Sequence, residues 1–123
     1  MFFLQVEDDF ASAHQLRGYK GKCENLHGHN WRVRVKVKGK TLDPLGMLVD
    51  FGVLKDMVKS CMDRLDHRFL NETPPFDAMN PTSENLAKYL FAEVNALLPE
   101  GVSVHKTTVW ESEKCAASYD GRE

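Results

Sequence analysis

The most constraining feature of this sequence is a strict two-residue alternation between positions 27 and 38. One parity carries two histidines, a tryptophan and three valines, whereas the other carries glycine, asparagine and four basic residues. Successive side chains of a β-strand point to opposite faces, so the alternation predicts a strand with one buried and one exposed face. The residues of the predicted buried face are His27, His29, Trp31, Val33, Val35 and Val37.

Weaker patterns predict the other elements. Residues 2–10 alternate in the same way, and His14 shares their buried parity. Apolar side chains at helical spacing follow Asp50 and Thr82, which are suitable helix N-caps. Segments 102–111 and 116–119 are predicted strands, and the apolar run 47–49 is compatible with a further short one. The order ββααββ indicates an α+β fold, in which an antiparallel sheet carries both helices on one face.

Length and composition restrict the class of protein. The 123 residues are expected to form one domain, residues 1–123, with a small core and little room for a deep pocket. A net charge of -2 argues against a basic protein that coats nucleic acids, and no apolar run is long enough to span a membrane. Three cysteines and an acidic N-terminal segment unlike a secretory signal suggest a reduced, cytoplasmic setting.

The strongest chemical signal is the tripeptide His27-Gly28-His29. Histidines at positions i and i+2 of a strand project to the same side and can share one metal ion. His14, on the neighbouring predicted strand, is the candidate third ligand. Three histidines with an open coordination position are typical of a catalytic zinc site, in which the metal polarises bound oxygens. The alternative is that these histidines are only hydrogen-bonded residues at a strand end.

A cysteine precedes this motif. Cys23 lies four residues before His27. It can be a reactive thiolate, with a pKa lowered by a nearby cation. It can equally be a fourth ligand that closes a structural zinc site. The spacing alone does not separate these interpretations.

Three further groups are candidates for chemistry. Asp66 and His67 can form a general acid/base pair, or they can be a solvated acid and a histidine that interacts with a helix dipole. Thr82 and Ser83 lie at a predicted helix start, where hydroxyls and free N–H groups can also bind a polar ligand. Glu111 can accept two parallel hydrogen bonds from the guanidine-like edge of a heterocycle, or it can be an ordinary exposed acid.

Basic residues are concentrated in one part of the chain. Eight of the sixteen lie between positions 17 and 40, together with a single acid. They form either the solvated face of a strand or a positive field that attracts a phosphorylated small molecule. Cys61 is expected in the core because it lies on the apolar face of the first helix. Cys115 and His105 receive no assignment.

Taken in chain order, these motifs resemble the 6-pyruvoyl-tetrahydropterin synthase / 6-carboxytetrahydropterin synthase family. The resemblance covers nearly the whole chain and lies in the segments 10–14, 23–30, 46–51, 65–71, 80–85 and 110–112. It implies a T-fold (tunnelling fold), which is a four-stranded antiparallel sheet with two helices on one face. Members of this family assemble as barrel-like trimers that pair into hexamers.

The resemblance also implies the roles of individual residues. It assigns Zn²⁺ to the three histidines, the catalytic base to Cys23 and the acid/base pair to Asp66 and His67. Glu111 would anchor the pterin, with Thr82 and Ser83 beside the ring. Such a site is hard to assemble within one small domain. We therefore expect a homo-oligomer whose active sites lie between subunits.

Segments 65–71 and 80–85 look most like the bacterial 6-carboxytetrahydropterin synthases of the route to queuosine and other 7-deazapurines. The implied reaction is a zinc-dependent lyase step that converts 7,8-dihydroneopterin triphosphate to 6-carboxy-5,6,7,8-tetrahydropterin, acetaldehyde and triphosphate. One alternative is a pyruvoyl synthase, which eliminates triphosphate without loss of carbon. The others are a folate-branch, aldolase-like activity and a non-catalytic module that binds pterin or metal.

Overall fold

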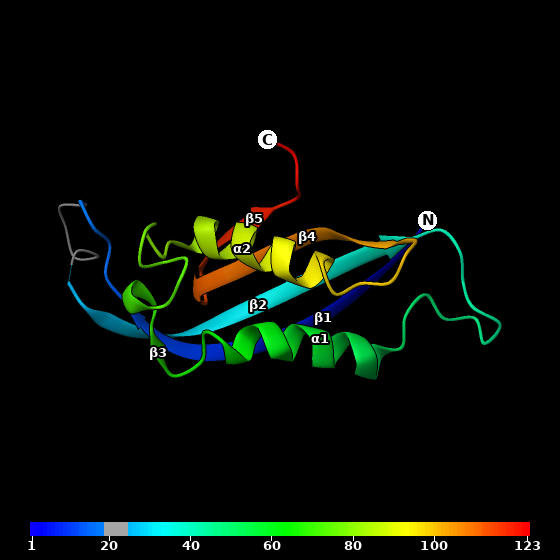
Figure 1. Ribbon diagram of the computed structural model, residues 1–123, viewed down its shortest axis with the longest axis horizontal. Coiled ribbons are helices and arrows are strands. Elements are labelled where there is room, and N and C mark those ends of the chain that lie inside the picture. Colours follow the sequence, from blue (N-terminus) through cyan, green and yellow to red (C-terminus); the bar gives the residue numbers. More distant parts are fainter. Residues whose placement is uncertain (19–24) are drawn as a thin grey trace.

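The computed structural model describes residues 1–18 and 25–123, which form one sheet and two long helices (Figure 1). The elements, in chain order, are β1 (Phe2–His14), β2 (His27–Gly39), α1 (Phe51–Asp63), β3 (Arg68–Phe69), the 3₁₀ turn η2 (Leu70–Glu72), α2 (Ser83–Asn95), β4 (Val102–Ser112) and β5 (Cys115–Tyr119). The strands are arranged in the order β3-β1-β2-β4-β5. The sheet is therefore built around the long hairpin of β1 and β2.

The register of β1 and β2 determines where the histidines lie. The two strands are antiparallel along their whole length, from the pair Phe2–Gly39 to the pair His14–His27. β4 pairs antiparallel with β2, and β5 with β4. The predicted inward direction of His14 is confirmed, since this side chain is only 1% exposed. The register thus brings His14 beside the His27-Gly28-His29 motif.

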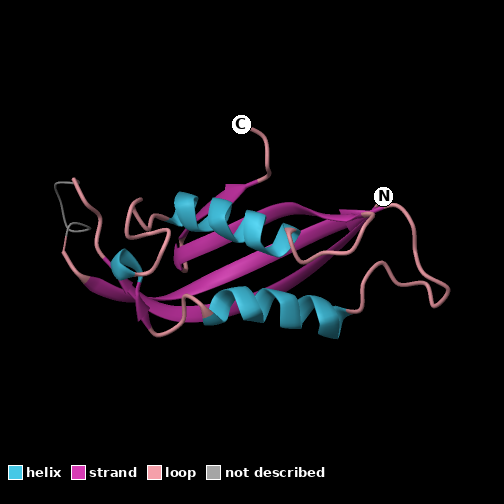
Figure 2. Cartoon of the chain, viewed as in Figure 1, coloured by secondary structure: helices cyan, strands magenta, loops and turns pink. Residues whose placement is uncertain are grey.

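One face of the sheet is covered by both helices (Figure 2). The predicted buried face of β2 is confirmed, because Trp31 and the three valines after it are completely buried. The apolar stripes of the helices face the same core; their buried residues are Leu54, Val58, Cys61 and Met62 of α1, and Leu86, Ala87, Leu90 and Val94 of α2. The opposite face of the sheet carries the basic residues of β2 and is left uncovered by the helices.

The two N-caps are also confirmed. The Asp50 carboxylate accepts the N–H of Val53 at 3.1 Å, and the Thr82 hydroxyl accepts the N–H of Asn85 at 3.1 Å. Each cap satisfies a backbone donor that the helix itself leaves free. Neither α1 nor α2 is long and apolar enough to cross a lipid bilayer, and the same holds for every helix within the described residues.

Two details differ from the prediction. A fifth, two-residue strand, β3, pairs parallel with β1 at Ser12 and Ala13, so the order of elements is ββαβαββ. The run 47–49 is not a strand. The preceding turn explains this, because the Asp43 carboxylate accepts the N–H groups of Leu45 and Met47 and the chain is folded back there.

Candidate active site

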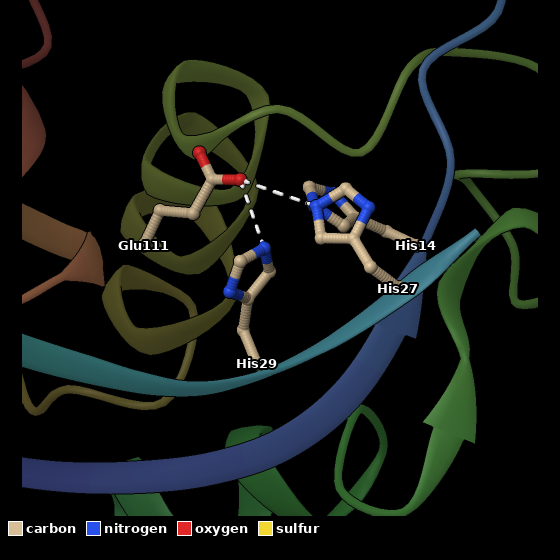
Figure 3. A group of neighbouring side chains, drawn as sticks. All are labelled: His14, His27, His29 and Glu111. Atoms are coloured by element: carbon tan, nitrogen blue, oxygen red, sulfur yellow. Dashed lines mark hydrogen bonds and ion pairs between the residues drawn. The ribbon is translucent and has the colours of Figure 1, made fainter. Parts of the chain in front are cut away.

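Four side chains converge at the end of the sheet where β1 finishes and β2 begins (Figure 3). His14 is the last residue of β1, and His27 and His29 are the first and third residues of β2. Glu111 comes from β4, which lies beside β2. One ligand atom from each side chain lies within 4.8 Å of the others. The three predicted histidine ligands are therefore brought together, and an acid joins them.

The spacing of the ligand atoms fits a single small cation. The Nε2 atoms of His14 and His27 are 3.0 Å apart. Glu111 Oε1 lies 3.2 Å from the Nε2 of His14, 3.1 Å from that of His29 and 3.8 Å from that of His27. Ligands bound about 2.0–2.2 Å from a tetrahedral zinc ion lie about 3.3 Å from one another. The observed separations lie on either side of that value.

Backbone carbonyls determine which ring nitrogens are available for a metal. His14 Nδ1 lies 2.8 Å from the Pro81 carbonyl oxygen, and His27 Nδ1 lies 2.6 Å from that of Asn25. A carbonyl only accepts, so both Nδ1 atoms must donate, and in the neutral rings, the form that binds a metal, both Nε2 atoms carry lone pairs. Two lone pairs 3.0 Å apart repel each other unless a cation lies between them. Three Nε2 atoms facing one point favour a metal ion in that position.

His29 completes the donor set. Its Nε2 atom is buried and makes no hydrogen bond of normal geometry within the described residues, although Glu111 Oε1 is close. Burial lowers the pKa of the His29 imidazole below its ordinary value, and this outweighs the opposing effect of the Glu111 carboxylate. The lowered pKa favours the neutral form, which is the form that binds a metal. Three imidazoles and one carboxylate are a donor set that suits Zn²⁺.

Asp66 and His67, the predicted acid/base pair, lie in contact with each other. His67 Nδ1 lies 3.0 Å from Asp66 Oδ2. The N–H of Ala11 donates to Asp66 Oδ1 at 2.9 Å, and this hydrogen bond is the main reason that the pKa of Asp66 lies below its ordinary value. The N–H of His67 in turn donates to the Ala11 carbonyl. The pair is thus attached to the backbone of β1, three residues before the ligand His14.

Among the described residues, the His67 side chain is not part of the cluster formed by His14, His27, His29 and Glu111. It is 83% exposed and lines an open hollow of about 510 Å³. Four other lining residues, Ala11, Ala13, Gly28 and Asn30, alternate with the three histidines along β1 and β2 and so face away from them. Ser12 and His29 also line the hollow. His67 also has a φ of +56°, in the left-handed region, where a residue other than glycine is strained by about 1–3 kcal/mol.

The predicted ligand-binding residues at the start of α2 lie next to the metal ligands. Thr82 caps the helix, and the neighbouring Ser83 is buried. Pro81, directly before the cap, provides the carbonyl that accepts from His14. The N-terminus of α2 is therefore attached to the His14 ring by one hydrogen bond. Cys23, the expected base, lies outside the described residues.

Two basic side chains of β2 contact residues of the neighbouring strands. The guanidinium groups of Arg32 and Arg34 lie 4.1 Å and 4.9 Å from the centre of the Trp110 ring. Arg34 also forms an ion pair with Glu7 at 2.7 Å. These contacts hold two of the basic side chains flat against the uncovered face of the sheet, beside the strand that carries Glu111.

Sequence reasoning missed two features of this site. It treated Glu111 only as an anchor for substrate, whereas the structure places its carboxylate against the three imidazoles. It also gave no role to Arg17, Asn71 or Asn80, which join the chain after His14 to the loop before α2. The only signal available for the two asparagines is that each lies in a segment that carries the family resemblance.

Comparison with known proteins agrees with the motifs. The family model for 6-pyruvoyl tetrahydropterin synthase matches residues 3–122. The chain belongs to this family. A solved structure of the 6-pyruvoyl tetrahydropterin synthase of Caenorhabditis elegans superimposes with a TM-score of 0.87 at 32% identity, and the match covers 98% of this chain and 96% of that one. The predicted T-fold is thereby confirmed.

Several curated relatives carry the 6-carboxy name. A putative 6-carboxy-5,6,7,8-tetrahydropterin synthase of Archaeoglobus fulgidus is 37% identical over 110 residues, which are 89% of this chain and 88% of the relative. The 6-carboxy-5,6,7,8-tetrahydropterin synthase of Synechocystis is 36% identical over 124 residues, which are 97% of this chain and 93% of the relative. The similar proteins thus include both the pyruvoyl and the 6-carboxy types.

Proposed function

We propose that this protein is a zinc-dependent carbon–carbon lyase, a 6-carboxytetrahydropterin synthase of the route to queuosine and other 7-deazapurines. It would convert 7,8-dihydroneopterin triphosphate and one water molecule to 6-carboxy-5,6,7,8-tetrahydropterin, acetaldehyde and triphosphate. The observation that carries the proposal is the convergence of three histidine Nε2 atoms in a member of this family. Relatives that bear the 6-carboxy name, at 37% and 36% identity, support the choice of this type.

Each residue of the site has its own role in the proposed reaction. His14, His27 and His29 would hold Zn²⁺, which polarises oxygen atoms of the substrate side chain and makes neighbouring protons more acidic. The Cys23 thiolate would remove a proton, and His67 would transfer protons while Asp66 keeps its ring in position. The Ala11 N–H keeps Asp66 ionised, as this task requires.

The substrate-binding roles rest on position and chemistry. Glu111 would accept two parallel hydrogen bonds from the 2-amino-pyrimidinone edge of the pterin. Thr82 and Ser83 would lie beside the ring, because Pro81 attaches the start of α2 to His14. The contact of Glu111 with the imidazoles supports a second role as a fourth ligand before substrate binds.

Product analysis tests the proposed reaction. The purified protein, loaded with zinc and given 7,8-dihydroneopterin triphosphate, is expected to release acetaldehyde and triphosphate in equal amounts. A coupled alcohol dehydrogenase assay measures the aldehyde, and mass spectrometry identifies the pterin. Triphosphate without acetaldehyde would identify a pyruvoyl synthase instead. A 6-hydroxymethyl product would identify the folate-branch activity.

We also propose that the active sites lie between subunits of a homo-oligomer, formed by trimers that pair into hexamers. Within the described residues, the Phe2–Phe10 part of β1 pairs only with β2, and β5 pairs only with β4. Such edges can pair with another copy and continue the sheet. His67, which is exposed and is not part of its own chain's histidine cluster, would then serve the metal site of a neighbour.

Mixed oligomers test this arrangement. His29→Ala and His67→Ala variants are each expected to be inactive alone, because one lacks a metal ligand and the other the acid/base group. When the two are unfolded together and refolded, random assembly should return about one quarter of wild-type activity, since that share of sites receives both intact residues. No recovery, with mixed oligomers confirmed by mass spectrometry, would mean that each site is built within one copy.

A further inference from the structure

The chain that follows His14 is paired with side-chain amides instead of a strand. The N–H of Gln15 donates to Asn71 Oδ1 at 2.8 Å, and Asn71 Nδ2 donates to the Gln15 carbonyl at 2.7 Å. Two residues further on, the Arg17 N–H donates to Asn80 Oδ1 at 2.9 Å, and Asn80 Nδ2 donates to the Arg17 carbonyl at 3.0 Å. Each asparagine thus makes both hydrogen bonds that a neighbouring strand would make.

The Arg17 side chain binds the same loop. Its guanidinium donates to three backbone carbonyls: Asn71 at 3.0 Å, Phe76 at 2.7 Å and Met79 at 3.1 Å. A planar guanidinium has five N–H donors in a rigid fork, which a lysine ammonium cannot reproduce. We call Arg17, Asn71 and Asn80 the loop clamp. Together they give the loop 70–81 a fixed shape around residues 15–17.

The loop clamp adjoins Pro81, the residue whose carbonyl orients the proposed ligand His14. The Asn80 carbonyl accepts from the N–H of Thr82 and from Asn85 Nδ2, so Asn80 is attached to α2 as well as to Arg17. Pro81, between Asn80 and the helix cap, is held on both sides. Its carbonyl accepts from His14 Nδ1 and so directs the Nε2 lone pair toward the other two histidines.

We propose that Arg17, Asn71 and Asn80 are positioning residues of the metal centre, which act by fixing the Pro81 carbonyl that orients His14. This inference rests on the proposed metal site. The fixed carbonyl selects the correct tautomer of His14 and sets the direction of its ring. Such partners of ligands strengthen metal binding by about 10–100-fold. The loop clamp is therefore part of the metal site, although none of its members contacts the metal ligands directly.

The test compares Arg17→Lys and Asn71→Ala with the wild-type protein and with Arg64→Lys. Arg64 is a matched control, because its guanidinium forms an ion pair with Glu93 of α2, 3.3 Å away. Zinc affinity is measured by competition with a chromophoric chelator at a temperature where circular dichroism shows every protein folded. The visible absorption of Co²⁺ in place of zinc reports the ligand geometry.

We expect both loop-clamp variants to bind zinc about 10–100-fold more weakly and to give an altered Co²⁺ spectrum, with the control unchanged. If the loop clamp only stabilised the fold, the variants would melt at lower temperature but keep wild-type zinc affinity and spectrum. That result would overturn the inference. A wild-type protein without zinc affinity would instead refute the metal site itself.

Discussion

Replacing His29 by alanine is expected to abolish zinc binding and turnover. His29 is the best of the three histidines to remove, because its ring is 24% exposed and its loss leaves a smaller void than loss of the buried His14. The change removes a direct nitrogen ligand. Losses of groups that only orient a ligand cost about 10–100-fold in metal affinity, so the loss of the ligand itself must cost more. Metal content after dialysis and the rate of triphosphate release measure the two effects.

A second histidine provides the control for this experiment. His105 lies on β4 at the far end of the sheet, where its ring contacts Phe3 at 4.9 Å between centres. His105→Ala should therefore keep the zinc content and activity of the wild-type protein. The metal site would be disproved if His29→Ala retained one zinc per chain. Loss of zinc from both variants would indicate a general folding defect and not the loss of a ligand.

Cys23 should give the complementary result. If it is the catalytic base, Cys23→Ala retains zinc and loses turnover, because three histidines still hold the metal. If it is a structural fourth ligand, the same variant loses zinc and becomes less stable. The second outcome would favour a non-catalytic pterin- or metal-binding module over an enzyme. His29→Ala and Cys23→Ala together thus distinguish residues that bind the metal from the residue that transfers a proton.

The parts of the fold that sequence predicted well are those determined by local rules. The alternation of β2 gave its buried face, and the caps Asp50 and Thr82 gave the helix starts. The short strand β3 could not be predicted, because two residues carry no periodicity. It forms because the adjacent Asp66 and His67 bind the backbone of β1 at Ala11, a contact across 55 residues of chain.

The same distinction applies to the site. The alternation of side chains predicted that His14, His27 and His29 lie on the same face of the sheet. They also lie close together, because β1 and β2 pair in a register that puts His14 opposite His27. Glu111 reaches this cluster only through the pairing of β4 with β2, which no local pattern specifies. The carbonyls of Pro81 and Asn25, which accept hydrogen bonds from the His14 and His27 rings and orient them, lie in loops, whose conformation follows few sequence rules.

The second large effect is expected from Glu111→Gln. Glutamine has the same size, but it replaces one acceptor oxygen by an NH₂ donor, so it cannot accept two parallel hydrogen bonds from a pterin edge. A hydrogen bond to a charged group contributes about 1.5–3 kcal/mol. Loss of the paired contact should therefore lower kcat/KM by about 100-fold or more, measured with 7,8-dihydroneopterin triphosphate. Glu113→Gln, at an exposed acid two residues further along the chain, is the matched control and should have no effect.

Zinc affinity of the same variant decides what the carboxylate does before substrate binds. The structure places Glu111 Oε1 3.1 Å from His29 Nε2 and 3.2 Å from His14 Nε2, close enough for a fourth ligand. If Glu111 fills that position in the resting protein, Glu111→Gln weakens zinc binding as well as catalysis, since a neutral amide is a poorer ligand than a carboxylate. If Glu111 only anchors the pterin, zinc affinity is unchanged and the loss appears in kcat/KM alone. An unchanged kcat/KM would exclude both roles, because either one requires the negative charge at this position.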